Sequence, residues 1–286
     1  MMKNAFRLMS ANPLPGSLLL IVLLLPLIVS WGQFIESGFW QETVSVTLLF
    51  WPKSAWKLAV PLPGWFIFAV FTLVYTLSMI RLAQKRSLVE AFLFILAGFL
   101  LAKAGGAAFQ AISGWSKLQP IGSQELAGKA NLLVFAAWHN PLWEELVFRG
   151  IPLLLLALLY SRKEWPGYAK WLYLIVPSLL FACYHVPGHG LGTLFESFLI
   201  GVLWAFAALR WGLGAPIILH IFADAMLVPT LPLMKNMPLH EIPWLVEYGW
   251  LFQSLSALCA LLLAVSIPML LFSGWRRAKR TQASEL

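Results

Sequence analysis

The feature that most constrains this chain is a series of apolar runs long enough to cross a lipid bilayer. A transmembrane helix needs about 20 predominantly apolar residues, and eight windows approach or exceed that length: 14–31, 62–80, 88–109, 132–160, 171–184, 191–209, 213–231 and 250–272. Only 11% of the residues are charged, whereas a soluble domain carries about 25%. The sequence therefore predicts an all-α, polytopic membrane protein with about eight transmembrane helices.

Nothing between the windows has the length or composition of a soluble domain, so we expect a single integral membrane domain over residues 1–286. It would consist of N-terminal helices over about 14–109, a core over about 129–231, and a C-terminal helix over about 250–273 with a basic tail. The segment 32–61, rich in Trp, is expected to lie along the membrane interface.

Prolines predict distortions in two of the helices. The window 132–160 is too long to cross straight, and Pro141 and Pro152 predict that it is kinked or partly unwound. Pro187 and Gly188 are expected to end the fifth helix. On that expectation His189 does not share a helix with His185 and is not a member of the candidate site.

The basic residues predict the orientation, since Lys and Arg accumulate in short cytoplasmic loops. Thirteen of the 20 basic residues fall on one side, namely Lys3, Arg7, Arg81, Lys85, Arg86, Arg162, Lys163, Lys170, Arg210, Arg276, Arg277, Lys279 and Arg280. Both termini are therefore expected in the cytoplasm. The net charge of +8 is spread loop by loop and forms no basic face, which argues against a nucleic-acid partner.

One set of six ionisable residues lies inside or directly beside the apolar windows, where a charge costs roughly 2.5–3.5 kcal/mol even on the lenient insertion scale. They are Glu144, Glu145, Arg149, His185, His220 and Asp224. Ionisable groups within membrane helices mark functional sites by default. This set has the chemistry of a centre that activates water or holds a metal ion.

The spacing of these residues predicts different roles for the two glutamates. Glu145 and Arg149 are four apart, with the acid on the N-terminal side, which favours an ion pair on one helix face. Glu144 points about 100° away and is free to act on water. His220 and Asp224 are also four apart, so their side chains share one face and converge.

Together these residues resemble the CAAX-protease and bacteriocin-processing family of membrane proteins, also called the Abi family. Its three motifs match in order as Glu144-Glu145-x-x-x-Arg149, Phe181-x-x-x-His185 and His220-x-x-x-Asp224. The resemblance covers roughly residues 132–228. The other windows match only in being hydrophobic.

The resemblance implies an intramembrane endopeptidase with a buried polar catalytic cavity, acting on a membrane-anchored protein or peptide. Glu144 would be the base and His185 would help to hold the attacking water. His220 and Asp224 would face the other side of the scissile carbonyl and stabilise the oxyanion. Around them, Phe181, His139 and Asn140 are expected to line the same site.

Two mechanisms fit these residues. In a glutamic-protease version no metal is required, and Asp224 orients His220 or donates a hydrogen bond in its protonated form. In a metal version a zinc-like divalent ion is held by ligands drawn from Glu144, His185, His220 and Asp224, and it acidifies the water. The family's third motif ends in Asn or Asp, and an Asp here slightly favours the metal version.

Two other classes of function remain open from the sequence. A catalytically silent scaffold or immunity protein of the same fold would bind a membrane peptide without cleaving it. An ion-coupled transporter would use the buried carboxylates for transport, but the chain shows no repeat between its halves.

Overall fold

The computed structural model describes residues 38–51, 56–84, 88–117, 130–160 and 165–227, with a few residues between 23 and 35. The predicted window 250–272 lies outside these residues, and so does most of 14–31. The structure is mostly helical, as predicted. The helices of 16 or more residues are α3 (Gly64–Gln84), α4 (Leu88–Ser113), α6 (Ala130–Glu145), α8 (Gly167–His189) and α9 (Leu194–Trp211).

Four helical segments of the described part are long and apolar enough to cross a membrane. They are Gly64–Leu82, Glu90–Ser113, Gly167–His189 and Leu191–Trp211. Many of their large side chains face outward, including Leu73, Leu101 and Trp171, which are 58%, 72% and 67% exposed. Such faces suit contact with lipid chains rather than water. The chain is therefore an integral membrane protein, with four such helices in the described part where eight were predicted for the whole.

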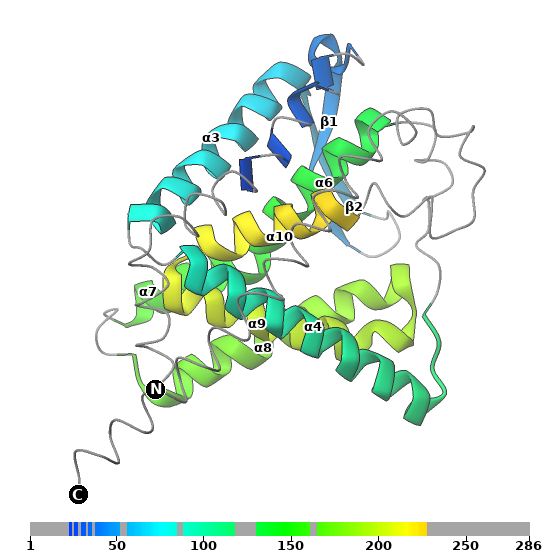
Figure 1. Ribbon diagram of the computed structural model, residues 1–286, viewed down its shortest axis with the longest axis vertical. Helices are drawn as coiled ribbons and strands as arrows, with labels where there is room; N and C mark the ends of the chain where they lie inside the picture. Colours follow the sequence, from blue (N-terminus) through cyan, green and yellow to red (C-terminus); the bar gives the residue numbers. More distant parts are fainter. Residues whose placement is uncertain are drawn as a thin grey trace, which may run out of the picture.

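The helices form two groups that meet at the centre of the molecule (Figure 1). In one group, α9 packs against α4 and α8. In the other, α10 (Gly214–Leu227) packs against α3 and α6. Helix α10 also contacts α9 directly and so joins the two groups. This crossing brings together the three segments that carry the sequence motifs.

The predicted window 132–160 is divided into three pieces. Helix α6 runs through Pro141 without ending, a π-helical turn η2 covers Leu146–Gly150, and α7 covers Ile151–Leu159. Pro152 has no N–H to offer the carbonyl four residues earlier, which favours a wide turn just before it. The predicted distortion thus falls directly after the paired glutamates.

Helix α8 is longer than predicted. It continues through Pro187 to His189, and Gly190 with φ +79° ends it. The expectation that Pro187 would end the helix is therefore wrong, because a proline within a membrane helix is tolerated where neighbours and local adjustments satisfy the freed carbonyl. His185 and His189 consequently lie one turn apart, with their rings stacked at a centroid distance of 5.6 Å.

An antiparallel hairpin is the exception to the all-α prediction. Strand β1 (Thr43–Trp51) pairs with β2 (Trp56–Pro63), with an irregularity in register between Thr47 and Leu49. The start of β1 alternates Thr, Val and Ser, which is the period-two pattern of a strand. The tryptophans of segment 32–61 predict an interfacial segment, whereas the structure places the hairpin there.

Close packing of α8 on α9 generates the first prediction. A Cβ added at Gly201 would lie 2.9 Å from both Cα and Cβ of Ser178. We expect Gly201→Ala to reduce the free energy of unfolding by about 1–3 kcal/mol, because the two helices must separate. Thermal unfolding of the purified protein in detergent measures this loss. Gly167→Ala is the control, since nothing lies within 4 Å of its Cβ, and equal melting temperatures for the two variants would contradict the prediction.

Candidate active site

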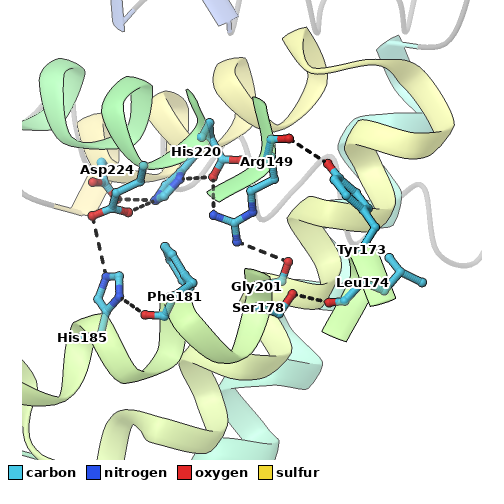
Figure 2. Close-up of polar contacts among 11 residues, drawn as sticks. Arg149, Tyr173, Leu174, Ser178, Phe181, His185, Gly201, His220 and Asp224 are labelled. Carbon is cyan, nitrogen blue, oxygen red and sulfur yellow. Dashed lines mark hydrogen bonds and ion pairs between the residues drawn. The ribbon is translucent and has the colours of Figure 1, made fainter. Parts of the chain in front are cut away.

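Four polar side chains predicted from the motifs lie close together at the crossing of α6, α8 and α10 (Figure 2). The Glu144 carboxylate lies between two imidazole rings: its Oε1 is 3.8 Å from His185 Nε2, and its Oε2 is 3.7 Å from His220 Nε2. Asp224 Oδ1 is 4.0 Å from the same His220 Nε2. The structure therefore gathers residues that are up to 80 positions apart in the chain.

His220 lies between the two neighbouring glutamates and contacts them through different ring nitrogens. Its Nδ1 is 2.8 Å from Glu145 Oε1, whereas its Nε2 faces Glu144 and Asp224. An ionised carboxylate only accepts hydrogen bonds, so His220 Nδ1 is the donor to Glu145. Glu145, and not Asp224, therefore orients this ring, a contact that the sequence spacing did not indicate.

His185 is oriented in the same sense by the backbone of its own helix. Its Nδ1 is 2.8 Å from the carbonyl oxygen of Phe181. A carbonyl accepts only, so Nδ1 carries the proton and Nε2 of the neutral ring presents a lone pair toward Glu144. Both histidines thus have Nδ1 anchored and Nε2 directed at the same carboxylate.

Arg149 is fully buried behind this cluster and contacts groups from several elements. Its Nη1 is 3.3 Å from Glu145 Oε1, and its Nη2 donates to the carbonyl of Gly201 on α9 at 3.2 Å. The guanidinium also lies 4.3 Å from the centroid of the Phe181 ring, a cation–π contact. Tyr173 donates to the Arg149 carbonyl at 3.3 Å. This one side chain therefore connects η2 with α8 and α9.

Burial decreases from one side of the cluster to the other. Glu145 and Arg149 are 0% exposed, and Glu144 and His220 are 8% exposed. The side chains of His185 and Asp224 are 19% and 29% exposed. A ligand approaching from outside would meet His185 and Asp224 first, while the ion pair stays closed off.

Of the remaining predicted residues, Phe181 contacts the two histidines of the cluster, whereas His139 and Asn140 bond to each other. Phe181 packs against the His185 ring at 4.3 Å between centroids and also contacts His220. His139 and Asn140 are bonded to each other, Nδ1 to Oδ1 at 3.1 Å. Within the described residues neither makes a hydrogen bond or ion pair with the central four, so their place in the site stays a prediction.

One residue beside the cluster, Trp204, is not indicated by any pattern in the sequence. Trp204 on α9 is buried, and its ring stacks on that of His220 with centroids 5.2 Å apart and planes 18° apart. A tryptophan in an apolar helix resembles any other core residue, so only the structure assigns it to the wall behind His220.

The donor types in the cluster are those that zinc takes, namely imidazole nitrogen and carboxylate oxygen. In the part of the chain that the structure describes, however, no group of three or more His, Cys, Asp and Glu side chains is placed so that it could hold a metal ion. The placement of the donors therefore does not support the metal version of the mechanism.

Comparisons with known proteins point to the same part of the chain. Residues 127–226 match a family described as type II CAAX prenyl endopeptidase Rce1-like, which confirms the resemblance drawn from the three motifs. An uncharacterized 24.3 kDa protein of Escherichia coli is 39% identical over 87 residues, which are 30% of this chain and 37% of that relative. No solved structure matches. The chain thus aligns with little more than a third of its relative's length.

The buried ion pair generates the second prediction. Arg149→Met leaves the Glu145 charge buried without its cation, so we expect the free energy of unfolding to fall by about 3–5 kcal/mol. Adding Glu145→Gln should recover part of the loss, because no unpaired charge then remains. Thermal unfolding in detergent measures both effects.

The matched control for this prediction is Arg210→Met. Arg210 also pairs with a glutamate, Glu90 at 3.4 Å, but its side chain is 42% exposed. An exposed pair contributes about 0–1 kcal/mol. Equal losses for Arg149→Met and Arg210→Met would show that burial of the pair has no special role.

Proposed function

We propose that this protein is an intramembrane endopeptidase that hydrolyses a peptide bond in a membrane-anchored protein or peptide. The observation that carries the proposal is the position of the Glu144 carboxylate between two imidazole Nε2 atoms at 3.8 and 3.7 Å, each on a ring whose Nδ1 is already bonded. The Rce1-like match over residues 127–226 supports the same reaction class.

Water activation is the role of Glu144 and His185 in this proposal. The 3.8 Å separation between Glu144 Oε1 and His185 Nε2 is too long for a direct hydrogen bond and short enough for one water molecule to contact both. That water donates one hydrogen to each and keeps a lone pair for the scissile carbonyl. Glu144 takes a proton as the water attacks and later gives it to the leaving amine.

Oxyanion stabilisation is the role of His220. A protonated His220 ring donates through Nε2 to the carbonyl oxygen as it becomes negative. Glu145 at Nδ1 and Asp224 near Nε2 both stabilise the positive ring by their charge. The stacked Trp204 ring holds the imidazole in plane, so the donor is in place before the substrate binds.

We propose the glutamic version of this mechanism, in which no metal takes part, and keep the metal version as the alternative. The substrate reaches the cluster on the side of His185 and Asp224, the two most exposed of its members. We further propose that both termini face the cytoplasm, as the basic residues indicate. A silent scaffold of the same fold is the alternative, and it would bind membrane peptides without cleaving them.

The third prediction concerns the proposed base. Glu144→Gln removes the proton acceptor while preserving side-chain size, and we expect cleavage of a membrane-anchored peptide library to fall by roughly 10²–10⁴-fold. The measurement is product detection by mass spectrometry after incubation in liposomes. Glu90→Gln is the control, because Glu90 lies in the exposed pair with Arg210 and its loss should leave cleavage unchanged.

Two outcomes would overturn the assignment. Equal product from the wild type and Glu144→Gln would remove Glu144 as the base. Binding of peptides by a folded wild-type protein that releases no product from any library member would favour the scaffold alternative.

The fourth prediction addresses metal dependence. Because no group of three or more donors among the described residues is placed to hold a metal ion, we expect a strong zinc chelator to leave the cleavage rate unchanged. The measurement is the initial rate before and after chelation, with elemental analysis of the same samples. Loss of activity that added zinc restores would contradict the glutamic version and favour the metal version.

A further inference from the structure

His189, the last residue of α8, lies one helical turn after His185. The two residues are four apart on one helix, so their side chains project from the same face. Their rings are stacked, with centroids 5.6 Å apart and planes 24° apart. His185 in turn presents its Nε2 to the Glu144 carboxylate at 3.8 Å. His189 therefore extends the polar groups of the candidate site by one turn toward the end of α8.

The backbone at the end of α8 is held on both sides of this turn. Gly190 ends the helix with φ +79°, a conformation that favours glycine, and its N–H donates to the carbonyl of Val186 at 2.8 Å. Two residues later, Gly192 donates to the carbonyl of Ser116 at 3.2 Å, which ties the turn to the segment after α4. The position of His189 is therefore fixed before any ligand binds.

The ring nitrogens of His189 are accessible and unoccupied by protein groups. The side chain is half-buried, and in the described part of the chain no group forms a hydrogen bond with its ring. The charged groups that act on it, Lys103, Lys117 and Glu196, pair with one another. By contrast, both histidines of the central cluster have Nδ1 bonded. A neutral imidazole offers one donor and one acceptor, so His189 can bind a polar group of a ligand.

An unwound peptide has the polar groups that such a ring binds. In an apolar setting each backbone N–H or C=O without a partner costs several kcal/mol, and an extended substrate presents both groups at every residue. Extended peptide rises about 3.3 Å per residue, so the 5.6 Å between the rings of His185 and His189 corresponds to roughly two residues. A substrate whose scissile carbonyl lies at His185 therefore brings a backbone amide to His189.

We propose that His189 is a substrate-binding residue that forms a hydrogen bond with a backbone amide of the peptide, roughly one to three residues from the scissile bond. This inference rests on the proposed peptidase function and adds a residue outside the three motifs to the site. The competing role is structural, in which the His189 ring only supports the His185 ring by stacking.

Two substitutions separate these roles. His189→Gln keeps a donor and an acceptor but removes the ring, whereas His189→Phe keeps a ring for stacking but removes both nitrogens. We expect His189→Phe to raise KM about three- to tenfold with kcat unchanged, and His189→Gln to keep a KM close to that of the wild type. A fall in kcat for His189→Gln together with wild-type kinetics for His189→Phe would assign the structural role and overturn the proposal.

Substrates with one backbone amide replaced by an ester connect His189 to the peptide. An ester has no N–H and a weaker acceptor than an amide, and the replacement is moved one residue at a time along the best-cleaved library peptide. At one position, one to three residues from the scissile bond, we expect the ester to raise the wild-type KM about three- to tenfold. The same ester should leave the KM of His189→Phe unchanged, because the bond is already lost. Equal ester effects in both proteins at every position would overturn the proposal.

The control variant is Gly188→Ala, in the same turn of α8, because nothing lies within 4 Å of a Cβ added there. Its KM should equal that of the wild type. A rise equal to that of His189→Phe would show that any change in this turn weakens binding, and would contradict the proposal.

Binding measurements separate this inference from the peptidase function. Fluorescence anisotropy with the Glu144→Gln variant, alone and combined with His189→Phe, measures the ester effect without cleavage. Absence of product with wild-type protein counts against the peptidase function. Equal ester effects on binding with and without His189→Phe count against the role of His189.

Discussion

The site depends on one buried contact, the ion pair between Glu145 and Arg149. Both side chains are fully buried, and a buried charge is tolerated when it is paired and further hydrogen bonds support it. Glu145 Oε1 also accepts from His220 on α10, and Arg149 also donates to Gly201 on α9. Satisfying two charges in an apolar interior therefore fixes α6, η2, α9 and α10 relative to one another.

The chemistry that we propose for Glu144 is a consequence of this arrangement. Its neighbour in the chain holds His220 by Nδ1, so that Nε2 of the same ring is directed at Glu144. The backbone of α8 holds His185 in the equivalent way. Two adjacent glutamates thus have different surroundings because successive side chains on a helix point about 100° apart. One faces the closed interior, and the other faces the partly exposed side of the cluster.

Membrane packing explains why small residues recur where helices meet. Lipid chains are as apolar as leucine, so helices associate in a bilayer by close approach and by polar contacts. Gly201 lets α9 lie against Ser178 and leaves its carbonyl free for Arg149. Gly106 does the same for α4 and Glu196. In both places a glycine brings a backbone close to a buried charged group.

The sequence by itself determined the membrane setting, the distortion of the fourth window and the motif residues that the structure brings together, because apolar length and rare buried charges are local properties of the chain. It also predicted the pairing of Glu145 with Arg149, since residues four apart on a helix are always neighbours. Only the tertiary structure decided that Glu145 orients His220, that α8 continues through Pro187 to His189, and that Glu196 joins Lys103 to Lys117. The side-chain contacts link residues up to 93 positions apart. The continuation of α8 depends on how neighbouring groups satisfy the carbonyl that Pro187 cannot bond. No local sequence pattern encodes either.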